Sequence, residues 1–100
     1  MKERRVVFSL EAEAELQELY EWIATAASPD VAFAYVTRIE AFCQRLAIAS
    51  ERGLSRDDIR PGLRILGFER RVTIAFIVEP ERVVILRLFY GGRDWETLLS

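Results

Sequence analysis

Several residue types are missing or rare in this chain. It contains no histidine, one cysteine (Cys43) and one lysine (Lys2). Histidine is the commonest general base and metal ligand at neutral pH, so its absence restricts catalysis to carboxylates, tyrosines and arginines. A lone cysteine cannot form an intramolecular disulfide, and the apolar neighbours of Cys43 predict a buried structural thiol rather than a reactive one.

Long apolar runs are also missing. No run reaches the roughly 18 residues that a membrane helix requires, and the apolar run after the basic N-terminus is too short for a secretory signal. We therefore expect a cytoplasmic protein with no membrane contact. The chain has 100 residues, of which 51% are hydrophobic, so residues 1–100 should form a single domain with one core.

Charge is distributed unevenly along the chain. Residues 1–51 carry five basic and nine acidic side chains, whereas residues 52–100 carry nine arginines and seven acidic side chains. Guanidinium groups form planar bidentate contacts with carboxylates and phosphates. For most single positions, a plain solubilising role on the surface remains the alternative.

The first half of the chain predicts a short strand followed by two helices. Residues 4–8 alternate as a strand, and the Ser9 hydroxyl can cap a helix that ends at residue 26 or 27. Ser28-Pro29 opens a second helix, which extends to about Ser50. Because the turn between them is so short, the two helices should form an antiparallel hairpin.

Each helix carries an apolar stripe at intervals of three and four residues, which must cover something large and apolar. Trp22 and Phe33 lie off the centre of these stripes. Each is either peripheral core or part of a partner-binding patch, and we expect each to be partly exposed.

The second half predicts a three-strand antiparallel meander, with strands near residues 63–68, 71–78 and 83–90. Period-two alternation predicts which side chains of the third strand share a face. One face should contain Val84, Leu86, Leu88 and Tyr90, and the other Val83, Ile85, Arg87 and Phe89. The fold class is thus α+β: a short N-terminal strand and an antiparallel helical hairpin packed on a mainly antiparallel sheet, in the order β-α-α-β-β-β.

Two segments flank the meander. The polar connection at residues 51–62 should be a solvated loop whose charges pair among themselves. After Gly91-Gly92, Asp94 can cap a last helical turn, with Trp95, Leu98 and Leu99 folding back on the core. The chain has no phosphate-binding glycine loop, paired-cysteine metal spacing or nucleophile elbow, so we expect no cofactor and no metal, and we look for function in surface arginines and partner grooves.

The order of these elements resembles the RelE/ParE superfamily of bacterial toxins, and ParE in particular, over nearly the whole chain. The resemblance depends on short segments in a fixed order: Val7-Phe8-Ser9 with Glu11-Ala12, Tyr20-Glu21-Trp22-Ile23-Ala24, Ser28-Pro29, Gly53, Arg56-Asp57-Asp58, Pro61-Gly62-Leu63-Arg64, Ile85-Leu86-Arg87-Leu88 and Gly91-Gly92-Arg93-Asp94.

This resemblance implies a toxin of a type II toxin–antitoxin pair that interferes with DNA gyrase and is held inactive by a ParD-like antitoxin. RelE relatives instead cleave messenger RNA on the ribosome, which requires cationic groups around the scissile phosphate and a group that moves protons. Here histidine is absent, and Tyr90 occupies a position where the family often has histidine. We therefore favour a toxin that is not an enzyme and binds no specific nucleic acid directly. The alternatives are a RelE-type endonuclease and an inactive relative that only binds antitoxin.

Two sets of candidate residues follow from the resemblance and the pattern together. The expected target-binding residues are Arg64, Arg87, Tyr90, Arg93 and Asp94. For Arg87, the alternative is a structural charge with a partner inside the fold. The expected antitoxin-binding residues are Leu16, Leu19, Tyr20, Trp22, Phe33, Val36, Arg56 and Arg60.

Overall fold

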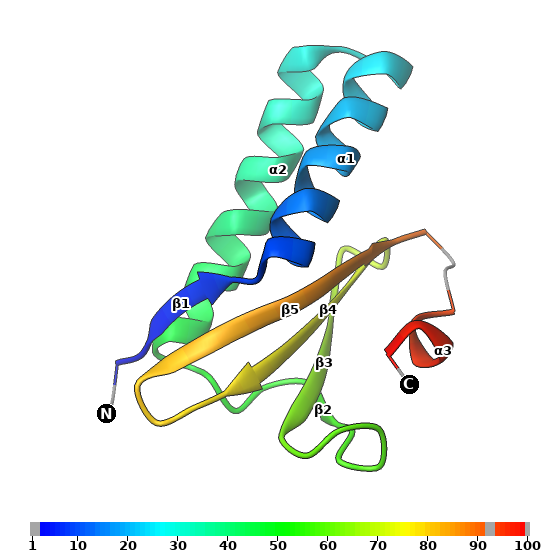
Figure 1. The fold of residues 1–100 in the computed structure, drawn as a ribbon. Helices are drawn as coiled ribbons and strands as arrows, with labels where there is room; N and C mark the ends of the chain where they lie inside the picture. The colour runs from blue at the N-terminus through cyan, green and yellow to red at the C-terminus, as the bar shows by residue number, and fades with distance from the viewer. Residues whose placement is uncertain (1–2, 92–93, 100) are drawn as a thin grey trace.

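The computed structural model describes residues 3–91 and 94–99. Within these residues, the chain forms a five-stranded sheet with a helical hairpin on one face and a short helix on the other (Figure 1). The elements in chain order are β1 (Arg5–Phe8), α1 (Leu10–Ala26), α2 (Pro29–Gln44), the 3-10 turn η1 (Arg45–Ala47), β2 (Leu54–Ser55), β3 (Leu63–Phe68), β4 (Val72–Val78), β5 (Arg82–Tyr90) and α3 (Trp95–Leu99). This is the α+β arrangement that the sequence predicts, with the additional strand β2.

Local sequence sets where the two hairpin helices begin. The Ser9 hydroxyl accepts a hydrogen bond from the Ala12 N–H at 3.0 Å and caps α1. The Ser28 hydroxyl does the same for α2, accepting from the Val31 N–H at 3.1 Å, and Pro29 occupies the first turn, where its missing N–H costs no helical bond. Figure 1 shows the two helices side by side, with their connected ends extending past the sheet.

The second helix ends earlier than the sequence predicts. α2 stops at Gln44 rather than near Ser50, and Arg45–Ala47 tighten into the 3-10 turn. The Ala47 carbonyl accepts a hydrogen bond from the Arg4 N–H at 2.7 Å, so the segment that leads into β1 uses an acceptor that a longer helix would have used itself. A tertiary contact therefore fixes this boundary.

The strand order in the sheet is β1-β5-β4-β3-β2. β3, β4 and β5 form the predicted antiparallel meander, and β1 pairs with β5 in parallel. The two residues of β2 pair with Ile65 and Arg64, in a connection where the sequence predicts only a loop. Gly53, with φ of 77°, allows this close approach, because a Cβ at that position would lie 2.3 Å from the Ile65 carbonyl oxygen.

A β-bulge in β5 changes which of its side chains face the helices. The register of β5 against β4 shifts at Leu86, which has no direct partner, and the alternation reverses beyond it. Ile85 and Leu88 therefore both belong to the cluster under the helices, and Phe89 belongs to the cluster on the opposite face. The prediction of a single uninterrupted alternation along this strand is wrong, because the bulge inserts one extra residue.

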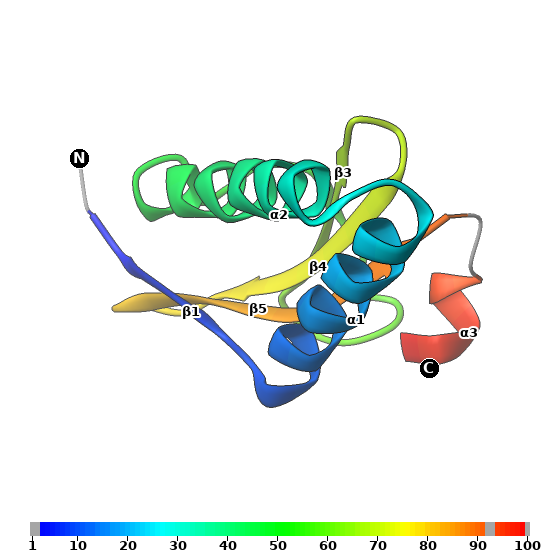
Figure 2. The ribbon, with the colours of Figure 1, turned by 90° about the horizontal axis from the view of Figure 1, so that it is seen from above.

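The sheet separates two apolar clusters. The larger one lies between the sheet and the helical hairpin and includes the fully buried Ile39 and Phe76. The smaller one includes Leu63 and Phe89 and is packed against Trp95 of α3. Figure 2, seen from above, shows α1 in front of β4 and β5, with α2 alongside them. Trp95 and Leu99 thus fold back on the sheet, as the sequence predicts. The prediction is wrong for Leu98, which is 49% exposed, because the short helix turns this side chain away from the cluster.

Side-chain exposure confirms three predictions about single residues. Cys43 is completely buried, and this burial raises the pKa of its thiol to about 12. Trp22 and Phe33 are 56% and 67% exposed.

Among residues 3–91 and 94–99, no helix is both long enough and apolar enough to cross a membrane.

Candidate partner-binding groove

The outer edge of β5 is only half covered by a neighbouring strand. In the described part of the chain, β1 pairs with β5 no further than Ile85. Beyond Ile85, two side chains, those of Ser9 and of Glu15 in α1, form hydrogen bonds with backbone groups of β5. The Ser9 hydroxyl donates to a β5 carbonyl at 2.7 Å, and the Glu15 carboxylate accepts a hydrogen bond from the Leu88 N–H at 2.8 Å. Beyond Ile85, side chains rather than a neighbouring strand therefore cover this edge of β5.

Glu15 is also the ion-pair partner of Arg87. Its Oε2 accepts from Nε of Arg87 at 2.9 Å and from Nη2 at 2.7 Å, and the hydrogen bonds raise the pKa of the guanidinium. The side chains of Glu15 and Arg87 are only 12% and 29% exposed, and the guanidinium lies 4.8 Å from the centroid of the Phe89 ring. Arg87 therefore has a structural partner inside the fold.

Two hollows flank a contact between Trp22 of α1 and Tyr90 at the end of β5. The centroids of the two rings lie 5.1 Å apart, and the ring planes are inclined by 54°. Both hollows are lined by these two residues. The first, of about 300 Å³, is also lined by Glu15, Glu18, Leu19 and Leu88. The second, of about 370 Å³, is also lined by Ile23, Ala26, Ala27, Val31, Tyr35, Arg38, Glu69 and Arg71. We call the two hollows together the Trp22–Tyr90 groove.

The first hollow is acidic. Glu11, Glu15, Glu18 and Trp22 recur at intervals of four and three residues, so they share one face of α1. Glu11 is close enough to act on Arg87, whose pKa it also raises. Two of the three carboxylates on this helix face, Glu11 and Glu15, thus act on Arg87.

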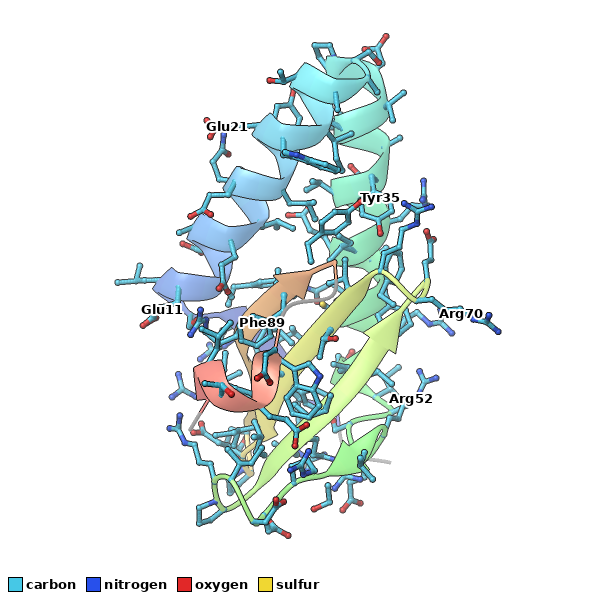
Figure 3. All side chains as sticks on the ribbon, turned by 90° about the vertical axis from the view of Figure 1, so that its right-hand side faces the viewer. Glu11, Glu21, Tyr35, Arg52, Arg70 and Phe89 are labelled. Atoms are coloured by element: carbon cyan, nitrogen blue, oxygen red, sulfur yellow. The ribbon has the colours of Figure 1, made fainter. Side chains whose placement is uncertain are left out.

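The second hollow carries cations. Arg38 and Glu69 form a bidentate pair with bonds of 3.0 and 3.2 Å, and Arg71 lines the same hollow. Glu69 and Arg70 form the β3–β4 turn with φ of 51° and 59°, a left-handed conformation that side-chain-bearing residues rarely adopt. The Arg38–Glu69 pair ties this turn to α2. In Figure 3, Glu11 of α1 and Arg70 lie on opposite sides of the molecule.

Residues 6–95 match the family described as "ParE toxin of type II toxin-antitoxin system, parDE". This chain belongs to the ParE toxin family. Among solved structures, a chain from the "Chromosomal ParDE TA system from P. aeruginosa" is similar in fold, with a TM-score of 0.77 and 24% sequence identity. The alignment covers 89% of this chain and 97% of that chain. A search of curated proteins finds no match.

In this ParE family member, the apolar candidates for antitoxin binding lie in different places. Leu19 and Trp22 line the Trp22–Tyr90 groove. Phe33 lies exposed on α2. Three others line a separate hollow of about 220 Å³ between α1 and α2: Leu16, Tyr20 and Val36. The structure thus divides these candidates between two hollows and one exposed position.

The two arginine candidates for antitoxin binding differ in their contacts. Arg56 pairs with Asp58 through bonds of 2.8 and 2.9 Å and with Glu96 of α3 at 2.9 Å, and it lies 5.3 Å from the centroid of the Trp95 ring. The hydrogen bonds that its guanidinium donates to Asp58 and Glu96 raise the pKa of Arg56. Arg60 is exposed. Arg56 therefore joins the C-terminal helix to the loop, whose charges pair partly among themselves as predicted.

The candidates for target binding are not gathered at one point. Nε of Arg64 donates to a loop carbonyl at 2.9 Å, beside the short strand β2. Tyr90 forms part of the groove, at the other end of the sheet. Asp94 caps α3 and accepts from the Thr97 hydroxyl at 2.7 Å, which lowers the pKa of its carboxyl group. Arg93 lies outside the described residues.

Several charged residues of the groove were not singled out in the sequence. The spacing of Glu11, Glu15, Glu18 and Trp22 is a signal that the sequence does contain, because it marks one helix face. No comparable pattern in the sequence predicts that Arg71 and Trp22 line the same hollow, because these residues come together only when the meander packs against the hairpin.

The groove combines apolar side chains, aromatic rings and charges of both signs. These are the features that hold a peptide segment of another protein. Residues 3–91 and 94–99 contain no group of three or more potential metal-ligating side chains.

Proposed function

We propose that this protein is the toxin of a type II toxin–antitoxin pair, that it arrests growth by inhibiting DNA gyrase in the cytoplasm, and that a ParD-like antitoxin neutralises it. The observation that carries this proposal is the match of residues 6–95 to the ParE toxin family. The resemblance to ParE implies gyrase as the target and a ParD-like protein as the antitoxin.

The charges of the groove support binding rather than phosphodiester cleavage. Cleavage of RNA requires cationic groups around the scissile phosphate. The first hollow instead presents Glu15 and Glu18, and Arg87 is bonded to Glu15. Because carboxylates repel the phosphate backbone, this surface is a poor site for RNA. The first hollow therefore fits a protein partner better than RNA.

Gyrase inhibition can be measured directly. The toxin, purified away from its antitoxin, is titrated into a supercoiling assay with gyrase from its own host. We expect a concentration-dependent loss of supercoiling or an accumulation of cleaved DNA, and we expect added antitoxin to reverse the effect. A toxin that arrests growth but leaves both readouts unchanged contradicts the gyrase proposal. Discrete in-frame cuts at mapped transcript ends would then indicate a RelE-type endonuclease, and no growth arrest at all would indicate an inactive relative.

Antitoxin binding has a separate test. We expect a small open reading frame for a ribbon-helix-helix protein beside this gene, and we expect its product to copurify with the toxin. If no neighbouring product binds, the antitoxin part of the proposal is wrong even where gyrase is inhibited.

Target inhibition and antitoxin binding can be tested separately with two variants in the same region of the fold. We propose that Arg64 contacts the target and that Arg60 contacts the antitoxin. Arg64→Ala should then weaken gyrase inhibition with little change in antitoxin affinity, and Arg60→Ala should do the reverse. Thermal unfolding of both variants controls for the loss of the Arg64 hydrogen bond to the loop. Equal effects of both variants on both activities would contradict this assignment.

A further inference from the structure

The Trp22–Tyr90 groove has one unpaired charge of each sign, at opposite ends. In the first hollow, Glu15 is neutralised by Arg87, whereas Glu18 is exposed and forms no ion pair within the described residues. In the second hollow, Arg38 is neutralised by Glu69.

Arg71 is the corresponding free charge of the second hollow. Its side chain is exposed and forms no ion pair with any residue that the structure describes. The opposite-sign charges of Glu18 and Arg71 thus lie on either side of the aromatic contact.

The middle of the groove is apolar. Trp22 is 56% exposed although its ring rests on Tyr90, and both rings line both hollows. Exposed aromatic rings surrounded by polar groups are typical of protein interaction sites. An aromatic face beside a carboxylate also attracts a cationic side chain.

We propose that the groove binds a segment of the antitoxin in a single orientation, with a lysine or arginine side chain at Glu18, apolar side chains across Trp22 and Tyr90, and an aspartate or glutamate side chain at Arg71. This inference rests on the proposed antitoxin pairing and adds to it the order of charges along the bound segment.

For an antitoxin segment with this order of charges, binding in the reversed direction is electrostatically unfavourable. It would bring like charges together at both ends of the groove, where contact with the partner removes water and strengthens their repulsion. Charge order thus selects the direction of the segment and discriminates against antitoxins with another charge order.

The test compares charge reversals inside and outside the groove. The variants are Glu18→Lys and Arg71→Glu, and the matched controls are Glu21→Lys on the same helix and Arg70→Glu in the same turn, neither of which lines the groove. The dissociation constant for the ParD-like antitoxin encoded beside this gene is measured by isothermal titration calorimetry. We expect each groove variant to weaken binding about tenfold or more, and each control to stay within about threefold.

Compensating changes in the antitoxin test the order of the charges. One lysine or arginine of the antitoxin, changed to glutamate, should restore affinity for Glu18→Lys. A different aspartate or glutamate, changed to lysine, should restore affinity for Arg71→Glu, and neither change should rescue the other toxin variant. Thermal unfolding of each variant verifies that it is folded.

Each other outcome overturns the inference. Groove variants that bind like their controls, a Glu18→Lys variant that binds more tightly, or losses that no charge exchange restores would all show that this charge order is wrong, while the antitoxin pairing stands. A wild-type toxin that binds no antitoxin removes the pairing and the inference together. A toxin that dimerises alone, and loses the dimer on Glu18→Lys, has a second copy of itself in the groove.

Discussion

Replacing Glu15 with alanine tests whether one carboxylate stabilises the half of β5 that does not pair with β1. This side chain accepts two hydrogen bonds from the Arg87 guanidinium and one from the Leu88 N–H, and it is only 12% exposed. Removal of one partner from a buried ion pair costs about 3–5 kcal/mol. Arg87 is 29% exposed and can regain some water, so we expect a loss of about 2–3 kcal/mol in the free energy of unfolding.

For a domain of this size, that loss corresponds to a fall of roughly 10–20 °C in the midpoint of thermal unfolding. The assay is urea and thermal unfolding followed by far-ultraviolet circular dichroism. Glu15→Gln keeps an acceptor for the Leu88 N–H but loses the charge, so it should lose about 1 kcal/mol less than the alanine variant. Glu13→Ala, an exposed residue of the same helix, is the control and should leave the free energy of unfolding nearly unchanged.

The pair can be separated from other effects by a double-mutant cycle with Arg87→Ala. If the ion pair acts as a unit, the two losses should be non-additive by about 1–2 kcal/mol. A loss below about 0.5 kcal/mol for Glu15→Ala, or full additivity in the cycle, would refute the view that Glu15 stabilises this strand edge.

Three further predictions follow from single sites. Gly53→Ala should lower the free energy of unfolding more than Gly91→Ala, because both glycines have positive φ but only at Gly53 would an added Cβ meet a backbone carbonyl. Equal losses of free energy for the two variants in urea unfolding would contradict the close contact at Gly53. Cys43 should resist a thiol reagent at about pH 8 until the protein unfolds, because its thiol is buried and has a raised pKa; rapid labelling of the native protein would show otherwise. The hydrogen bond that the Asp57 carboxylate accepts from the Gly62 N–H lowers the pKa of Asp57, so the stabilisation by this carboxylate should be present above about pH 4 and be lost at lower pH. The difference in thermal midpoint between wild type and Asp57→Asn should therefore shrink from about pH 7 to about pH 3. A difference that stays constant over this range would contradict the prediction.

The structure also explains why some boundaries could be predicted and others could not. The start of each hairpin helix is a local event, in which the Ser9 or Ser28 hydroxyl bonds an N–H three residues ahead. The end of α2 depends on a bond between the Ala47 carbonyl and the Arg4 N–H, which are distant in sequence. Local signals therefore predict the first boundary and miss the second.

The same distinction applies to the candidate site. Trp22 could be recognised because its position relative to the apolar stripe follows from the helix period alone. Its contact with Tyr90 could not be predicted in the same way, since the bulge at Leu86 reverses the alternation of β5 and sends Tyr90 to the helix face. Arg64 and Arg87 were recognised as charges on strands, but the hydrogen-bond partners that hold them come from distant segments.

The α+β class, the helical hairpin, the meander, the buried thiol and the resemblance to ParE could all be inferred from the amino-acid sequence. These depend on periodicity, capping residues and short motifs, which operate over a few residues. Four features became visible only once the chain was folded: the parallel pairing of β1 with β5, the cover of the rest of the β5 edge by side chains, the ion pair of Arg87 with Glu15, and the groove with opposite charges at its ends. The physical reason is that each of these features joins residues far apart in the chain, and no local pattern specifies such contacts until the hairpin packs on the sheet.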